Sequence, residues 1–116
     1  MKILIAEDNQ DLREMYRDYF SNGGRNQIIM AENGTKAWEL VQEMSFDLII
    51  SDNNMPGMTG LEFVTRIKRV LNLKTPVVIC SSDDVMDKAH ELGVAFVDKL
   101  QFSKLQNLVR DVGSRL

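Results

Sequence analysis

Short apolar runs alternate along this chain with stretches in which apolar residues recur every three or four positions. A continuous apolar run is typical of a parallel strand that is covered on both faces, whereas the wider spacing predicts an amphipathic helix. Five runs, each bounded by polar residues or turn formers, predict strands at residues 2–6, 27–31, 48–51, 77–80 and 94–97.

Each predicted strand is followed by a predicted helix. The first helix begins at Asp11 and ends at Asn22-Gly23-Gly24, and the fourth is short, from Val85 to Leu92. Thr59 with Glu62, and Ser103 with Gln106, match the capping box that begins a helix. The side chains expected to face the core are Leu12, Met15, Tyr16, Tyr19 and Phe20 in the first helix, Ala37, Leu40, Val41 and Met44 in the second, Phe63, Val64, Ile67, Val70 and Leu71 in the third, and Leu105, Leu108, Val109 and Val112 in the last.

Five strand–helix pairs without a repeat or an internal boundary predict one α/β domain over residues 1–116, with helices on both faces of a parallel sheet. A dinucleotide-binding half and a flavodoxin-like sheet both fit this size. The first turn, Glu7-Asp8-Asn9-Gln10, has none of the glycines that let a backbone approach a pyrophosphate, and no phosphate-binding P-loop motif occurs. Nucleotide binding is therefore disfavoured.

Charge and cysteine content narrow the possible partners. A net charge of -3 and a pI near 5.1 argue against direct nucleic-acid binding, which needs a basic face. The single cysteine, Cys80, lies in an apolar run and is interpreted as a small buried hydrophobe, so no disulfide is expected. The apolar start is too short for a signal segment or a membrane span, and the expected compartment is the cytoplasm.

Polar residues gather where the predicted strands end. Glu7 and Asp8 follow the first strand, Asp52 the third, Ser81 the fourth and Lys99 the fifth. Parallel strands would bring these ends together, and three carboxylates need a shared proton or a cation to stay close. One lysine balances only part of that charge, and hard oxygen ligands suit magnesium.

This cluster predicts phosphoryl chemistry. A metal ion held by Asp8 and Asp52 would leave an Asp52 oxygen free to attack phosphorus, while Lys99 and Ser81 would hold phosphoryl oxygens. Structural explanations stay open for each residue alone, since Glu7 or Asp8 can cap a helix, Ser81 can form a turn and Lys99 can be a solvated charge. Only their convergence favours a site.

From Ile3 to Val112 the chain resembles the receiver domain of a two-component response regulator. The resemblance implies a flavodoxin-like, doubly wound (βα)5 sandwich whose five-stranded parallel sheet has the order 2-1-3-4-5. The residues that carry it are Glu7-Asp8, the motif D-x-x-M-P-x-M-x-G at Asp52, Met55, Pro56, Met58 and Gly60, the segment from Pro76 to Ser81, and Lys99.

The resemblance also implies a function. Asp52 would accept a phosphoryl group from a sensor histidine kinase or phosphotransfer protein, with Mg²⁺ bound by Asp8, Asp52 and the Asn54 carbonyl, and by Glu7 directly or through water. Ser81 and Phe96 would then move and change a surface formed by the fourth helix, fifth strand and fifth helix, which a downstream protein or output domain reads. The residues at positions 54 and 83 would tune hydrolysis. Such a domain catalyses only its own phosphorylation and dephosphorylation.

The chain departs from the family pattern near this surface. Leu100 stands where relatives have a proline, so a cis peptide is not expected. Ser82 replaces an alanine, and the segment from Ser81 to Lys99 is short by roughly four residues, about one helical turn. The fourth helix should therefore be curtailed. Whether the chain stands alone or belongs to a longer regulator stays open.

Two other functions fit part of the sequence. A receiver-like interaction module that signals without phosphorylation would fit the departures, although not the retained acidic residues. A phosphatase with an aspartyl nucleophile would want a second aspartate two residues after Asp52, where the chain has Asn54. Trp38 and His90 are interpreted as a partly exposed packing residue and a surface residue.

Overall fold

The computed structural model describes all residues, 1–116, and contains one parallel sheet. Its strand order is β2-β1-β3-β4-β5, which confirms the flavodoxin-like, doubly wound (βα)5 prediction. The strands are β1 (Lys2–Ala6), β2 (Gln27–Ala31), β3 (Leu48–Ser51), β4 (Val77–Ser81) and β5 (Ala95–Asp98).

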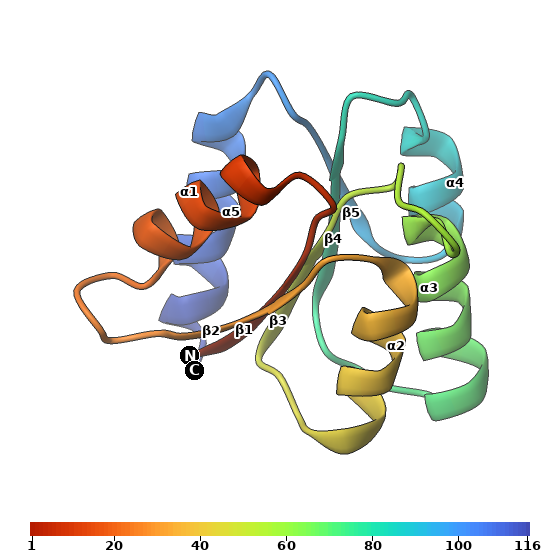
Figure 1. Cartoon of the computed structure of the whole chain (residues 1–116), viewed down its shortest axis with the longest axis horizontal. Coiled ribbons are helices and arrows are strands. Elements are labelled where there is room, and N and C mark those ends of the chain that lie inside the picture. The colour runs from red at the N-terminus through yellow and green to blue at the C-terminus, as the bar shows by residue number, and fades with distance from the viewer.

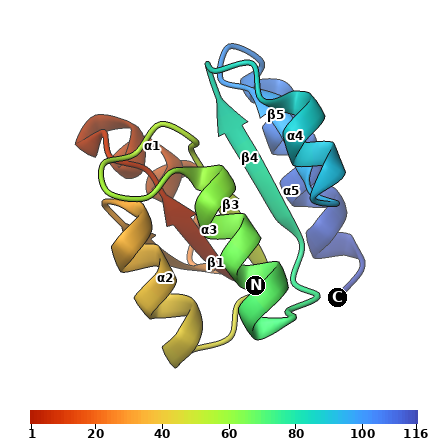
Figure 2. The same cartoon turned by 90° about the vertical axis from the view of Figure 1, so that its right-hand side faces the viewer.

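Helices cover both faces of this sheet (Figure 1). Two of them, α1 (Gln10–Phe20) and α5 (Phe102–Ser114), lie on one face. The other face carries α2 (Gly34–Glu43), α3 (Gly60–Arg66) and α4 (Met86–Glu91), which Figure 2 shows on the near side. The carboxyl ends of the strands meet at one edge, the upper edge in Figure 1.

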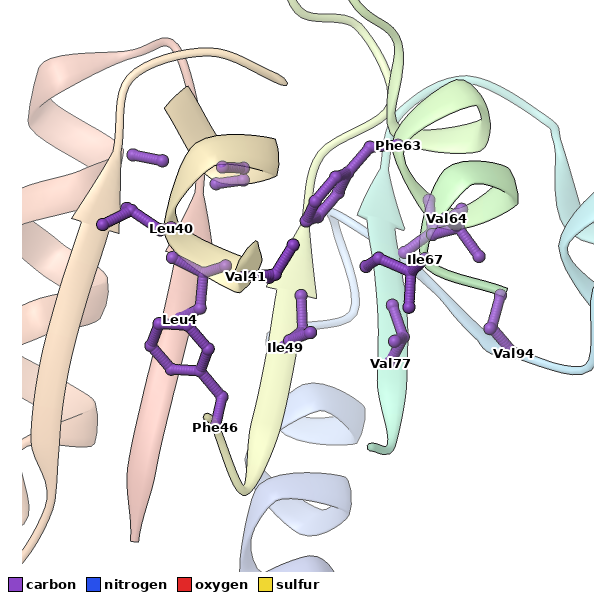
Figure 3. Close-up of a cluster of buried hydrophobic side chains, with 14 of the residues drawn as sticks. Leu4, Leu40, Val41, Phe46, Ile49, Phe63, Val64, Ile67, Val77 and Val94 are labelled. Atoms are coloured by element: carbon purple, nitrogen blue, oxygen red, sulfur yellow. The ribbon is translucent and has the colours of Figure 1, made fainter. Parts of the chain in front are cut away.

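The strands are buried on both faces because alternate side chains point to opposite sides. In β1, Ile3 and Ile5 belong to the cluster under α1 and α5, whereas Leu4 belongs to the cluster under α2 and α3. Figure 3 shows the second cluster, in which Phe63 and Ile67 from the third helical segment point toward β3 and β4. Two complete cores hold the central strands rigidly, so their ends can carry a site.

Most element boundaries agree with the sequence predictions to within one or two residues. Ser81 is the last residue of β4, and β5 ends at Asp98 instead of residue 97. Asn9 caps α1, whose first residue is Gln10, and the Thr59 side chain accepts a hydrogen bond from the Glu62 N–H, as expected. The fourth helix has only six residues, which confirms that it is short.

The prediction that Val70 is buried is wrong. The third helix continues from α3 into a π-helical turn, η1 (Ile67–Leu71), which has a wider hydrogen-bond spacing than an α-helix. The turn shifts the helical register, so Ile67 stays fully buried while Val70 is 66% exposed. In α1, Met15 and Tyr19 are also more exposed than predicted, whereas Tyr16 and Phe20 on that stripe are buried and Leu12 packs against the core.

The predicted capping box of the last helix is also wrong. Helix α5 begins at Phe102, after a turn in which the Gln101 N–H donates to the Asp98 carbonyl. Ser103 therefore lies inside the first helical turn, and no side chain caps this helix. The turn includes no cis peptide bond, in agreement with the prediction from Leu100.

The predicted burial or exposure of Cys80, His90 and Trp38 is confirmed. Cys80 is buried and forms no disulfide, and His90 is exposed. Trp38 is partly buried against the core, with the Arg66 guanidinium 5.9 Å from the centre of its ring. None of the helices is both long enough and apolar enough to cross a membrane.

Gly60 lets the first turn of α3 approach the end of β3 closely. A Cβ atom at this position would lie 2.3 Å from the Asp52 carbonyl oxygen and 2.9 Å from the Cα of Asn53. Both neighbours are backbone atoms, which cannot move aside cheaply. Gly60 therefore fixes the position of the loop that follows Asp52.

We expect Gly60→Ala to lower the free energy of unfolding by about 2 kcal/mol or more, because overpacking here displaces backbone. Urea denaturation measures this change. Gly113→Ala is the matched control, since its Cβ would meet only the flexible Met1 side chain at 3.2 Å. That variant should be unchanged or more stable by up to about 1 kcal/mol. Equal effects of the two substitutions would contradict the steric explanation.

Candidate functional site

The parallel ladder continues past the strand ends and places the polar residues side by side. The Glu7 N–H donates to the Ala31 carbonyl at 3.0 Å, and the Asp52 N–H donates to the Ala6 carbonyl at 2.9 Å. The Lys99 N–H donates to the Ser81 carbonyl at 3.1 Å. Each residue is thus positioned by its neighbour's backbone, and Glu7, Asp52, Ser81 and Lys99 share one edge of the sheet.

Lys99 bridges two buried carboxylates. Its Nζ lies 2.8 Å from Asp52 Oδ2 and 3.1 Å from Glu7 Oε2. Glu7 is 1% exposed and Asp52 is 5% exposed, while the lysine side chain is 20% exposed. The other Asp52 oxygen, Oδ1, accepts the Asn53 N–H at 2.7 Å, so both carboxylate oxygens are oriented.

Burial and charge oppose each other in this triad. Burial and the neighbouring Asp52 raise the pKa of Glu7, and Lys99 lowers it by less. For Lys99, burial alone would lower the pKa, but the hydrogen bond and charge of Asp52, together with Glu7, raise it above its ordinary value. The lysine is therefore firmly protonated, and ionisation of Glu7 costs more free energy than ionisation of a solvated carboxyl group.

Asp8 completes an acidic cluster at the mouth of the site. One carboxylate oxygen from each of Glu7, Asp8 and Asp52 lies within 4.8 Å of the others, and Asp8 is exposed. Asp8 takes no part in the Lys99 ion pairs. Three clustered carboxylates, one of them exposed to solvent, are a donor set of the kind that Mg²⁺ prefers. Asn54 borders the cluster, with its N–H 3.4 Å from Asp52 Oδ1.

The two predicted switch residues lie apart from the ion pairs. Ser81 is fully buried, and its Oγ accepts the Asp83 N–H at 3.1 Å, with no hydrogen bond to Asp52. Phe96 is half-buried on β5 and packs against the cluster under α2 and α3. Neither side chain forms a hydrogen bond with Glu7, Asp8 or Asp52.

Two further residues contribute contacts that the sequence analysis missed. Arg13 Nη1, from α1, donates to the Glu7 carbonyl at 2.8 Å and so holds the loop that carries Glu7 and Asp8. Asn53 is buried and its side chain bonds two different segments of the chain. The sequence offered two signals for these contacts. Arg13 is a basic residue one turn after the helix cap Asn9, and Asn53 is an amide directly after Asp52.

Comparison with known proteins identifies the architecture. The family model described as "Response regulator receiver domain" matches residues 3–109. Among solved structures, the receiver domain of the Francisella response regulator 1452 superimposes with a TM-score of 0.87, at 25% identity, over 98% of this chain and 97% of that one.

Two curated relatives show the range of proteins that contain this sequence type. The chemotaxis protein CheY of Pseudomonas aeruginosa is 30% identical over 99 residues, which cover 84% of this chain and 80% of that protein. The autoinducer 2 sensor kinase/phosphatase LuxQ of Vibrio parahaemolyticus is 31% identical over 100 residues. That match covers 84% of this chain but only 12% of LuxQ, so the chain corresponds to a small part of the larger protein.

The raised pKa of Glu7 predicts a specific pH dependence of stability. The folded protein binds the proton of the Glu7 carboxyl group more tightly than the unfolded chain does, in which the pKa is 4.5. The stability that this proton contributes is therefore complete below pH 4.5 and is lost as pH rises from 4.5 through the higher pKa of the folded state. In the presence of a chelator, Glu7→Gln should gain stability relative to wild type as pH rises above 4.5. Urea denaturation at several pH values tests this. Glu43→Gln, at an exposed position, is the control, and a Glu7→Gln difference that does not grow with pH would contradict the prediction.

Proposed function

The chain belongs to the response regulator receiver family, and from that premise we propose that it is a phosphoacceptor that carries a two-component signal on Asp52. The donor is a phosphohistidine of a sensor histidine kinase or phosphotransfer protein. The observation that carries the proposal is the position of Asp52, which is buried at the end of β3 with Lys99 Nζ 2.8 Å from one oxygen.

The chemistry is a displacement at phosphorus. An Asp52 carboxylate oxygen attacks, a P–O bond forms, and the P–N bond to the donor imidazole breaks. The imidazole leaves with the electron pair and takes up a proton. The Asn53 N–H on Oδ1 and the Lys99 ammonium on Oδ2 restrict rotation of the Asp52 carboxylate and so fix its orientation. Positioning of this kind supplies much of the rate in phosphoryl transfer.

Lys99 serves the same reaction through its charge. At rest it pairs with both Asp52 and Glu7, and its ammonium lies where the oxygens of a phosphoryl group on Asp52 would arrive. Exchange of a carboxylate partner for a phosphoryl partner keeps the lysine paired throughout. A point charge with three donors is suited to this exchange.

Glu7, Asp8 and Asp52, with the Asn54 carbonyl, are the residues that would hold Mg²⁺. The clustering of the three carboxylates within 4.8 Å and the exposure of Asp8 support this assignment. When bound, the ion neutralises negative charge between the carboxylates and the phosphoryl oxygens. Asp8 gives the site an open side, where an ion and its waters can enter.

Ser81 and Phe96 would convey phosphorylation to the surface. The Ser81 Oγ accepts a bond from Asp83, which leaves the hydroxyl proton available for a phosphoryl oxygen. Phe96 lies on β5, the strand beside Ser81, and would turn inward when the β4–α4 loop moves. The surface of α4, β5 and α5 would then meet a downstream protein or output domain. The only chemistry proposed for the domain is its own phosphorylation and the hydrolysis of its own acyl phosphate. The predicted compartment is the cytoplasm.

A receiver-like interaction module that signals without phosphorylation is the second candidate. It is favoured by the six-residue α4 and by Leu100, which is 93% exposed directly after Lys99. Such a module would bind its partner equally well with and without a phosphodonor. The two candidates differ in whether Asp52 becomes phosphorylated.

We expect a small-molecule phosphodonor with Mg²⁺ to label the wild type with an acid-labile phosphoryl group, and Asp52→Asn to abolish the labelling. An amide oxygen is too weak a nucleophile to replace the carboxylate. A chelator should also prevent labelling, because Lys99 alone does not balance the negative charge of the three carboxylates and the incoming phosphoryl group. Radiolabel incorporation or intact mass provides the measurement.

Asp87→Asn is the matched control, because Asp87 is an exposed aspartate on α4 away from the strand ends. This variant should be labelled like the wild type. Labelling of Asp52→Asn at the wild-type level would exclude Asp52 as the acceptor. An unlabelled wild type would favour the phosphorylation-independent module.

A further inference from the structure

Asn53, the residue after the proposed acceptor, joins three segments of the chain. Its backbone N–H donates to Asp52 Oδ1, and its carbonyl accepts the N–H groups of Met55 and Gly60. Its side-chain oxygen accepts the Leu61 N–H at 3.1 Å, and its side-chain nitrogen donates to Asp83 Oδ2 at 3.4 Å. Only the last of these contacts reaches the β4–α4 loop.

The orientation of this amide is determined by its partners. The Leu61 N–H is a donor at the start of α3, so it must face the amide oxygen of Asn53. The amide nitrogen is consequently directed toward Asp83, whose carboxylate can only accept when ionised. Because Asn53 is 9% exposed, an unpaired amide there would be costly, and the two contacts support each other.

Asp83 continues this connection to Ser81. The Asp83 N–H donates to Ser81 Oγ at 3.1 Å, while the carboxylate of the same residue receives the Asn53 amide. The serine oxygen is thereby held as an acceptor, and its proton is left to point elsewhere. The position of the Ser81 hydroxyl thus depends on a loop that Asn53 anchors to the segment after Asp52.

We propose that Asn53 is a positioning residue for phosphoryl transfer, which holds the β4–α4 loop through Asp83 so that the Ser81 hydroxyl is directed at the phosphoryl group on Asp52. This inference rests on the proposed function. It assigns a role to the side chain of Asn53, beside the contact that the Asn53 backbone N–H makes with Asp52 Oδ1. It also gives a physical route from Asp52 to the loop that leads into α4, because the Asn53 side chain bonds both to Leu61, in the segment after Asp52, and to Asp83 in that loop.

A reversed pair, the double variant in which the amide of Asn53 and the carboxylate of Asp83 exchange places, separates this role from a general effect on stability. Asn53→Asp places a carboxylate against Asp83 and removes the donor, while it keeps the oxygen that accepts from Leu61. Adding Asp83→Asn restores one amide and one carboxylate with the wild-type net charge. The double variant can therefore re-form the contact in the opposite direction, although each side chain has changed.

The experiment measures the initial rate of Asp52 labelling by a small phosphodonor at saturating Mg²⁺. We expect Asn53→Asp to slow labelling about tenfold, because the transition state then loses one charge-assisted hydrogen bond, from the Ser81 hydroxyl to a phosphoryl oxygen. The double variant Asn53→Asp with Asp83→Asn should recover most of this loss. Ser81→Ala should slow the wild type by a similar factor but add little to Asn53→Asp, because both changes remove the same hydroxyl contact. Urea denaturation checks that each variant is folded.

Asp83→Ala provides a second route if a buried carboxylate at position 53 prevents folding. It removes the acceptor of the amide at a half-buried loop position and buries no new charge. It should slow labelling, and Ser81→Ala should add little to it. Wild-type rates in Asn53→Asp or Asp83→Ala, full additivity with Ser81→Ala, or no recovery in the reversed pair would overturn the inference. A wild type that is not labelled would instead contradict the proposed function itself, and this inference with it.

Discussion

The ion pairs of Lys99 with Asp52 and Glu7 are the constraint on which the site depends. Two nearly buried carboxylates within 3.1 Å of one ammonium lose much of their hydration, and each would be strongly destabilising without its partner. The fold therefore has to deliver three side chains from β1, β3 and β5 to one point. It does so with backbone hydrogen bonds that continue the ladder beyond each strand.

This arrangement leaves negative charge uncompensated. Three carboxylates lie together, and the one lysine at the site pairs with Glu7 and Asp52 but not with Asp8. Burial raises the pKa of Glu7 despite that lysine. Replacement of Glu7 by a neutral residue would remove the free-energy cost of a buried carboxylate beside Asp52. The acidic cluster is therefore not explained by a contribution to the stability of the fold. A site of this kind is poised for a further cation and for the transfer of an anionic group, which is why its electrostatics support the proposed phosphoacceptor function.

The fold could be predicted from the sequence because its signals are local and strong. Continuous apolar runs predict parallel strands, and their ends place Glu7, Asp52 and Lys99 together. Val70 was mispredicted because a π-helical turn breaks the periodicity, and the start of α5 because a turn at Gln101 precedes Ser103. Asn53 and Arg13 were missed because their partners, Asp83 and the Glu7 carbonyl, are defined only by tertiary structure.

The most direct test of the account is to locate the phosphoryl group. After incubation with a small phosphodonor and Mg²⁺, borohydride reduces an acyl phosphate to the alcohol and releases phosphate, which marks the modified residue for peptide mass spectrometry. The account predicts reduction of the Asp52 side chain, dependent on the donor and on Mg²⁺. Reduction at Asp8 or at any other acidic residue, with Asp52 unchanged, would contradict it.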